Sequence, residues 1–162
     1  MESRERLSWR LPAPWEGTQR LIRVSCTNGS EQSVAAPFDN PGGGIIAPPV
    51  HVPEVDITIM WDSVNGGIAG LRRDGDGLDV VWTASARPSM QPVVFPESGE
   101  LVINDFTEAG SDDLIVLDLE TGRTKSRVAT GARLANGMFL TAGEARDVYY
   151  CTTGTLARVS WE

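Results

Sequence analysis

The chain has 162 residues, of which 41% are hydrophobic and 22% are charged. This balance predicts a soluble globular chain and excludes a disordered or membrane-embedded one. Fourteen Lys and Arg against 22 Asp and Glu give a net charge of −8. Nucleic acid and membrane surfaces are therefore not expected as partners, because both require clustered cations.

The residues near the amino terminus are charged where a secretory signal would be apolar. This predicts a cytoplasmic location, unless the chain is part of a longer protein. Cys26 and Cys151 lie far apart, and His51 is the single histidine. The sequence thus lacks the clustered ligands of a structural zinc site.

Short apolar runs between turn residues follow one another along the whole chain. Seventeen Gly and ten Pro interrupt the sequence so often that long helices are excluded. We therefore predict an all-β fold. The predicted strands are 20–26, 33–36, 45–50, 57–61, 68–71, 78–83, 92–95, 101–106, 114–119, 125–129, 138–140, 148–151 and 156–161.

These strands recur in groups with a period of roughly 41 to 46 residues, which is typical of four-stranded propeller blades. We predict β-propeller blades of four antiparallel strands, about three blade equivalents in all, forming an open arc. The predicted division is an irregular lead-in over 1–17, a partial blade over 18–41, blades over 42–87 and 88–133, and a partial blade over 134–162.

Glycine-containing segments are interpreted as connections. Residues 74–77 and 120–122 carry the glycines that tight hairpins need, so both are predicted turns. Gly42, Gly43 and Gly44 lack the Lys and Ser or Thr of a phosphate-binding loop. They are interpreted as a flexible connector between blades.

Two segments carry parts of one pattern: Leu114-Ile-Val-Leu-Asp-Leu-Glu-Thr-Gly122 has a strand, Leu-Asp and Thr-Gly, and the run over 67–82 has a strand, a turn and a second strand that ends in Trp82. This pattern resembles the repeat of quinoprotein-like propellers. Dehydrogenases of that family bind pyrroloquinoline quinone with a stacked Trp, two adjacent cysteines and calcium ligands. The sequence has no Cys-Cys pair, so no cofactor is predicted.

A second pattern covers residues 127–131, 135–138 and 147–150. It resembles gluconolactonase and regucalcin-like six-bladed propellers, in which an Asn-Gly places the Asn on a divalent metal in the central channel. The matching position is Asn136, although companion Glu and Asp ligands are not found. This resemblance implies the alternative function, a metal-dependent lactonase or related hydrolase with a cation such as calcium.

Three further residues are candidates for contacts in the channel or its loops. His51 follows the start of a strand and could reach the channel mouth as a base or ligand. Asn104 and Asp105 interrupt an apolar strand, so they must be hydrogen-bonded or lie near the channel. No residue is assigned a catalytic role, because no base lies beside a nucleophile in a recognisable motif.

Other polar and aromatic residues are given structural interpretations. Asp74, Asp76 and Asp79 surround a hairpin turn, and Glu108, Asp112 and Asp113 are expected in a solvated loop. Trp82 and Trp161 lie near strand ends and are predicted to wedge between blades.

The sequence thus predicts a non-catalytic propeller module for binding or scaffolding, the carboxy-terminal part of a larger quinoprotein-like propeller being one form of this. An isolated arc would expose apolar faces and strand edges. A protein partner or self-association is therefore expected to complete the propeller.

Overall fold

The structure is a computed structural model that describes residues 19–24, 26, 29, 31–44, 47–75, 77–133, 139–152 and 154–161, with the side chains of 31–34 and 133 excepted. Thirteen strands and one short 3-10 helix, η1 (Pro96–Ser98), lie in these ranges. In this part of the chain, no helix is long and apolar enough to cross a membrane.

The strands form four sheets, and within each sheet they pair antiparallel in sequence order. The first sheet has two strands, the second and third have four each, and the fourth has three. They are β1 (Leu21–Val24) and β2 (Glu31–Ala35); β3 (Val50–Val52), β4 (Ile57–Trp61), β5 (Ile68–Asp74) and β6 (Gly77–Ala84); β7 (Val93–Phe95), β8 (Glu100–Phe106), β9 (Ser111–Asp118) and β10 (Thr124–Arg133); and β11 (Phe139–Ala142), β12 (Asp147–Cys151) and β13 (Leu156–Ser160).

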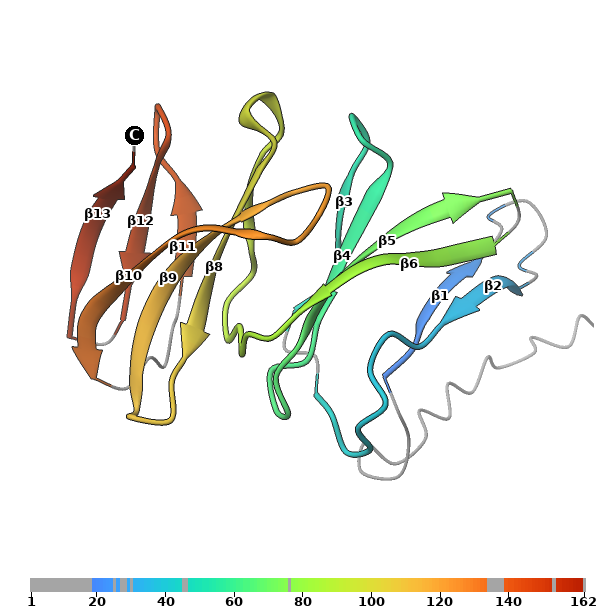
Figure 1. Cartoon of the computed structure of the whole chain (residues 1–162), viewed down its shortest axis with the longest axis horizontal. Coiled ribbons are helices and arrows are strands. Elements are labelled where there is room, and N and C mark those ends of the chain that lie inside the picture. Colours follow the sequence, from blue (N-terminus) through green and yellow to red (C-terminus); the bar gives the residue numbers. More distant parts are fainter. Residues whose placement is uncertain are drawn as a thin grey trace, which may run out of the picture.

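The sheets stand side by side in chain order, with the first and fourth sheets at opposite ends of the row (Figure 1). The predicted all-β fold of four-stranded antiparallel sheets in an open arc is confirmed. The strand predicted over 45–50 overlaps β3 only at Val50, since β3 runs from Val50 to Val52, and residues 45 and 46 lie outside the described residues. Pro48 and Pro49 precede it and have no N–H to donate to a ladder.

Alternate residues of β8 and β9 pack into two different hydrophobic cores, one on each face of the third sheet. Ile115 and Leu117 of β9 pack toward the second sheet in one cluster. Leu114 and Val116 pack toward Leu140, Val148 and Tyr150 of the fourth sheet in another. A third cluster joins Ala35 of the first sheet to Met60 and Leu71 of the second. Strand alternation therefore explains why β9 is apolar on both faces.

Trp82 fastens the second sheet to the third, as predicted. Its indole lies between Gly70 of β5 and Gly122 of the turn after β9, where a side chain on either glycine would overlap the ring. The indole Nε1–H donates to the carbonyl of Leu119 at 3.0 Å. Trp82 is consequently only 7% exposed although it lies on the outer strand β6.

The glycines at 42–44 differ from the expected flexible connector. The Gly44 N–H donates to the Asp62 carboxylate at 3.2 Å, and the Ser63 N–H donates to the Gly44 carbonyl at 2.8 Å. Asp62 is fully buried and also accepts from the N–H groups of Val64 and Asn65. These bonds hold the glycine segment against the turn that follows β4.

Candidate functional site

One pocket of about 890 Å³ is formed by three successive sheets. It is lined by the turns that join the first and second strands of the second, third and fourth sheets, residues 53–56, 96–99 and 143–146, which we call the mouth turns. All three lie at the upper edge of Figure 1. Strands β7 and β11 lie next to each other below them. We call this pocket the mouth pocket. It forms where the equivalent turns of three successive sheets come together.

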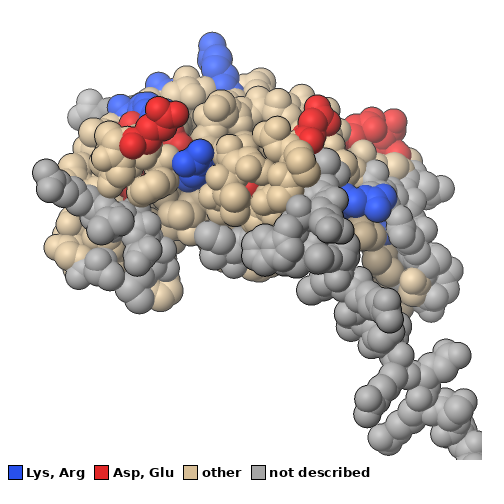
Figure 2. Space-filling model, turned by 90° about the horizontal axis from the view of Figure 1, so that it is seen from below, with Lys and Arg blue, Asp and Glu red and all other residues tan. Residues whose placement is uncertain are grey.

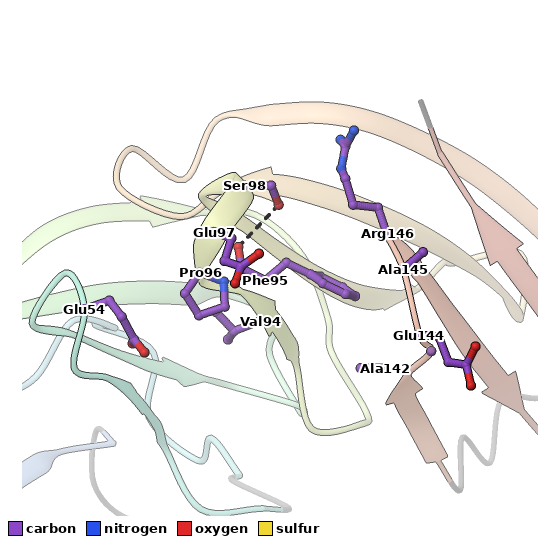
Figure 3. Close-up of a pocket in the computed structure, with 11 residues that line it drawn as sticks. Glu54, Val94, Phe95, Pro96, Glu97, Ser98, Ala142, Glu144, Ala145 and Arg146 are labelled. Atoms are coloured by element: carbon purple, nitrogen blue, oxygen red, sulfur yellow. Dashed lines mark hydrogen bonds between the residues drawn. The ribbon is translucent and has the colours of Figure 1, made fainter.

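Each mouth turn contributes one exposed glutamate to the mouth pocket, namely Glu54, Glu97 and Glu144. Figure 3 shows Glu54 on one side, Glu144 on the other, and Pro96 and Phe95 between them. None of the three was predicted as a site residue from the sequence. The available signal was the dipeptide Pro-Glu after two of the first strands, at 53–54 and 96–97, and Gly-Glu at the third, 143–144.

The mouth pocket also contains one cation, Arg146, whose charge is already matched. Its Nη2–H and Nε–H groups donate to the two carboxylate oxygens of Glu100 at 2.7 and 3.0 Å. The guanidinium also lies 5.9 Å from the ring centre of Trp161. Arg146 therefore does not neutralise the three glutamates of the mouth turns.

Glu100 is the buried anchor beneath the mouth pocket. Besides Arg146, its carboxylate accepts from Ser98 Oγ at 2.9 Å and from Trp161 Nε1 at 3.1 Å, so it ties β8 to the fourth sheet. Burial raises its pKa, but the bonds from Arg146, Trp161 and Ser98 outweigh burial and lower the pKa to about 2. Trp161 thereby lies between the third and fourth sheets, as predicted.

His51 lies elsewhere. It is an exposed residue of β3 whose Nδ1 is 3.1 Å from Thr58 Oγ1 of β4. It lines a smaller pocket of about 320 Å³ together with Leu21, Ile22 and Arg73. The structure therefore places His51 toward the first sheet and outside the mouth pocket.

Asn104 and Asp105 hold the connection between β6 and β7. The buried Asn104 accepts from the N–H groups of Ser89 and Met90 at 3.1 and 3.0 Å. Asp105 accepts from the Arg87 N–H at 2.7 Å and pairs with Arg127 at 2.7 Å. Both side chains are thus used in loop contacts within the fold.

Asp112 lies in a strand and not in the loop where it was expected. It was expected in a solvated loop, but β9 extends back to Ser111 and Asp112 is fully buried. The pairing of Asp112 with Phe106 and of Asp113 with Asp105 lengthens the strand. Asp112 accepts from Tyr150 Oη at 2.6 Å and from Asn104 Nδ2 at 3.2 Å. Burial raises its pKa, whereas these two bonds act in the opposite direction.

Metal ligation is not supported by the residues that the structure describes. Among them, no group of three His, Cys, Asp or Glu side chains is placed to hold a metal ion. The metal candidate Asn136, and Asp76 of the 74–77 turn, lie outside the described residues. Gly75 in that turn has a φ of +55°, and Asp74 pairs with Gly77, as a hairpin requires.

The end of the molecule opposite the mouth turns is seen in Figure 2. There the described Lys and Arg side chains are interspersed with Asp and Glu, and they form no continuous basic surface on this face.

Comparison with known proteins identifies the fold. No protein-family model matches the chain, and no curated protein matches it. Among solved structures, the chain is similar to BamB from Moraxella catarrhalis, with a TM-score of 0.59 and 19% sequence identity. The match covers 87% of this chain and 40% of that chain. The predicted similarity to quinoprotein-like propellers is thus confirmed at the level of the fold: the chain has the fold of a partial, unclosed β-propeller.

Proposed function

We propose that the chain is a non-catalytic binding or scaffold module, and that the mouth pocket is its binding surface. The observation that carries this proposal is the convergence of three mouth turns on one pocket of about 890 Å³. Binding residues are often placed on loops that a rigid scaffold positions. Here the scaffold is the set of packed sheets held by Trp82 and Glu100.

The chemistry of the pocket favours a cationic segment of a partner. Glu54, Glu97 and Glu144 surround a floor that includes Val94 and Phe95. Three exposed carboxylates steer a cation toward the pocket, and the apolar floor accommodates the stem of a Lys or Arg side chain. Such steering is weakened by salt.

A fluorescent peptide of Lys, Arg and Ala tests this proposal by anisotropy, with a Glu-containing peptide of equal length for comparison. We expect the cationic peptide alone to bind, and the triple variant Glu54→Gln, Glu97→Gln, Glu144→Gln to weaken binding at least about tenfold. Glu120→Gln is the matched control, because Glu120 is exposed but lies outside the mouth pocket. Equal binding by the triple variant and the wild type would refute the proposal.

A further inference from the structure

The two ends of the row of sheets each present an apolar face that no described element covers. In the fourth sheet, Phe139, Cys151 and Leu156 lie directly opposite one another in register, and Tyr149 lies on the same face. Phe139 and Leu156 are 64% and 75% exposed. Their strand neighbours Leu140 and Tyr150 point the other way, into the core shared with the third sheet. We call this surface the carboxy-terminal end face.

The first sheet shows the same division. Leu21 packs against the cluster shared with the second sheet. Ile22 and Val24 alternate with it along β1 and are 49% and 51% exposed. These two residues define the amino-terminal end face, at the opposite end of the row from the other face (Figure 1).

Where two sheets meet inside the molecule, the apolar face of one is covered by the next sheet. One face of each sheet packs on the next sheet along the chain, as Leu114 and Val116 pack toward Val148 and Tyr150. The carboxy-terminal end face therefore needs a following sheet, and the amino-terminal end face needs a preceding one. A second copy of this chain offers both surfaces at once.

We propose that two copies associate head to tail, with the carboxy-terminal end face of each covering the amino-terminal end face of the other. This arrangement has two-fold symmetry about the channel axis and leaves neither end face exposed. The amount of chain agrees with it, because the matched 87% of one copy corresponds to 40% of the BamB chain, and the same part of two copies to about four-fifths. The dimer would also bring two sets of mouth turns to one channel mouth. The dimer is tested by the mass of the protein in solution and the proposed function by peptide binding, so either proposal can fail without the other.

Light scattering of the wild-type chain over a hundredfold range of concentration is the first test. We expect a dimer of constant mass. A monomer throughout would overturn the proposal and leave further sheets of a longer chain, or a different protein, as the occupant. A mass that grows with concentration would also overturn it, because head-to-tail contacts that do not close form open chains.

Single variants then test which faces meet. Phe139→Asp and Ile22→Asp each place a charge in both junctions of a homodimer, so each is expected to be monomeric. An equal mixture of the two is expected to recover dimers, because one of the two junctions then contains only wild-type faces. Val81→Asp, on the exposed part of β6, is the matched control and should remain dimeric.

The mixture separates this arrangement from a face-to-face dimer through the fourth sheet alone. In that case Ile22→Asp would be dimeric by itself, and Phe139→Asp would stay monomeric when the two are mixed. Either result would overturn the proposal. Leu156→Asp and Val24→Asp provide a second pair if either first variant does not give a cooperative melt. The wild-type mass decides the question of association independently of every variant.

Discussion

The indole ring of Trp82 lies across the backbone of Gly122, which belongs to the neighbouring sheet. Gly122 has a φ of +67°, and a Cβ at this position would overlap the ring. Because Trp82 also donates to Leu119 of the same turn, one aromatic residue on an outer strand closes the core between two sheets. The Thr121-Gly122 turn and Trp82 therefore act as a pair across the junction between the second and third sheets.

Gly122→Ala is expected to lower the free energy of unfolding by about 3 kcal/mol, because it adds a steric clash to the strain of a left-handed conformation. Gly110→Ala is the control. Gly110 has a φ of +74°, but no atom lies within 4 Å of the position that a Cβ would take, so the Ala variant should lose only about 1 kcal/mol. Urea titrations of both variants measure the difference. Equal losses would mean that the contact with Trp82 contributes nothing.

The low pKa of Glu100 predicts how the stability of the fold depends on pH. Its pKa is about 2 in the folded chain against an ordinary value of 4.5. A folded pKa below the unfolded one means that the ionised group stabilises the fold above about pH 4.5, and that this contribution is lost as the pH falls toward 2. Between pH 6 and pH 3 the loss is about 2 kcal/mol.

Glu100→Gln isolates this contribution. The variant should be less stable than the wild type at pH 6, and the gap should shrink by about 2 kcal/mol at pH 3. Glu97→Gln, which removes a nearby exposed carboxylate, is the control for general charge effects. A gap between Glu100→Gln and the wild type that stays constant with pH would show that the Arg146 and Trp161 contacts do not depend on the charge of Glu100.

Tyr150 and Asp112 form a buried bond between β12 and β9 at 2.6 Å. Tyr150→Phe should cost about 1 to 3 kcal/mol of unfolding free energy, since it leaves one oxygen of a fully buried carboxylate without its donor. The adjacent Tyr149 is 40% exposed, and Tyr149→Phe should change stability by less than about 0.5 kcal/mol. Similar effects of the two substitutions would contradict this assignment.

Calcium distinguishes the binding module from the alternative lactonase. A ligand that binds the folded state raises the melting temperature. The binding module is proposed to hold no calcium, so we expect millimolar calcium to leave its melting temperature unchanged. The same melt of Asn136→Ala is the comparison. A rise with calcium in the wild type that disappears in Asn136→Ala would favour a channel metal and the hydrolase.

Much of the fold could be predicted from local pattern. The strand Ile57–Trp61 coincides with its prediction, because turn residues bound an apolar run on both sides. The wedge at Trp82 also followed from its position near a strand end. In contrast, β10 runs to Arg133, beyond the predicted 125–129. The added residues include Ala132, which is buried in the core shared with the fourth sheet, and Arg133 pairs with Ser111 of β9 beyond an irregularity in the register.

The site was less accessible to sequence reasoning. Glu100 and Trp161 meet only when β8 and the fourth sheet pack together, and no local period encodes such a pair. Asp112 was misplaced because its charge suggested solvent, whereas Tyr150 and Asn104 satisfy it inside the core. The glutamates of the mouth turns were recoverable in principle, since Pro53-Glu54 and Pro96-Glu97 occupy the same place in successive repeats.

Amide chemical-shift mapping of the isotope-labelled chain, during titration with the Lys and Arg peptide, shows directly whether the mouth pocket is the binding surface. We expect the shifts to concentrate in the mouth turns, residues 53–56, 96–99 and 143–146, and to saturate. Shifts centred instead on the opposite turns, such as those after Asp62 and Thr107, or no shifts at all, would contradict a binding module that acts through the mouth pocket.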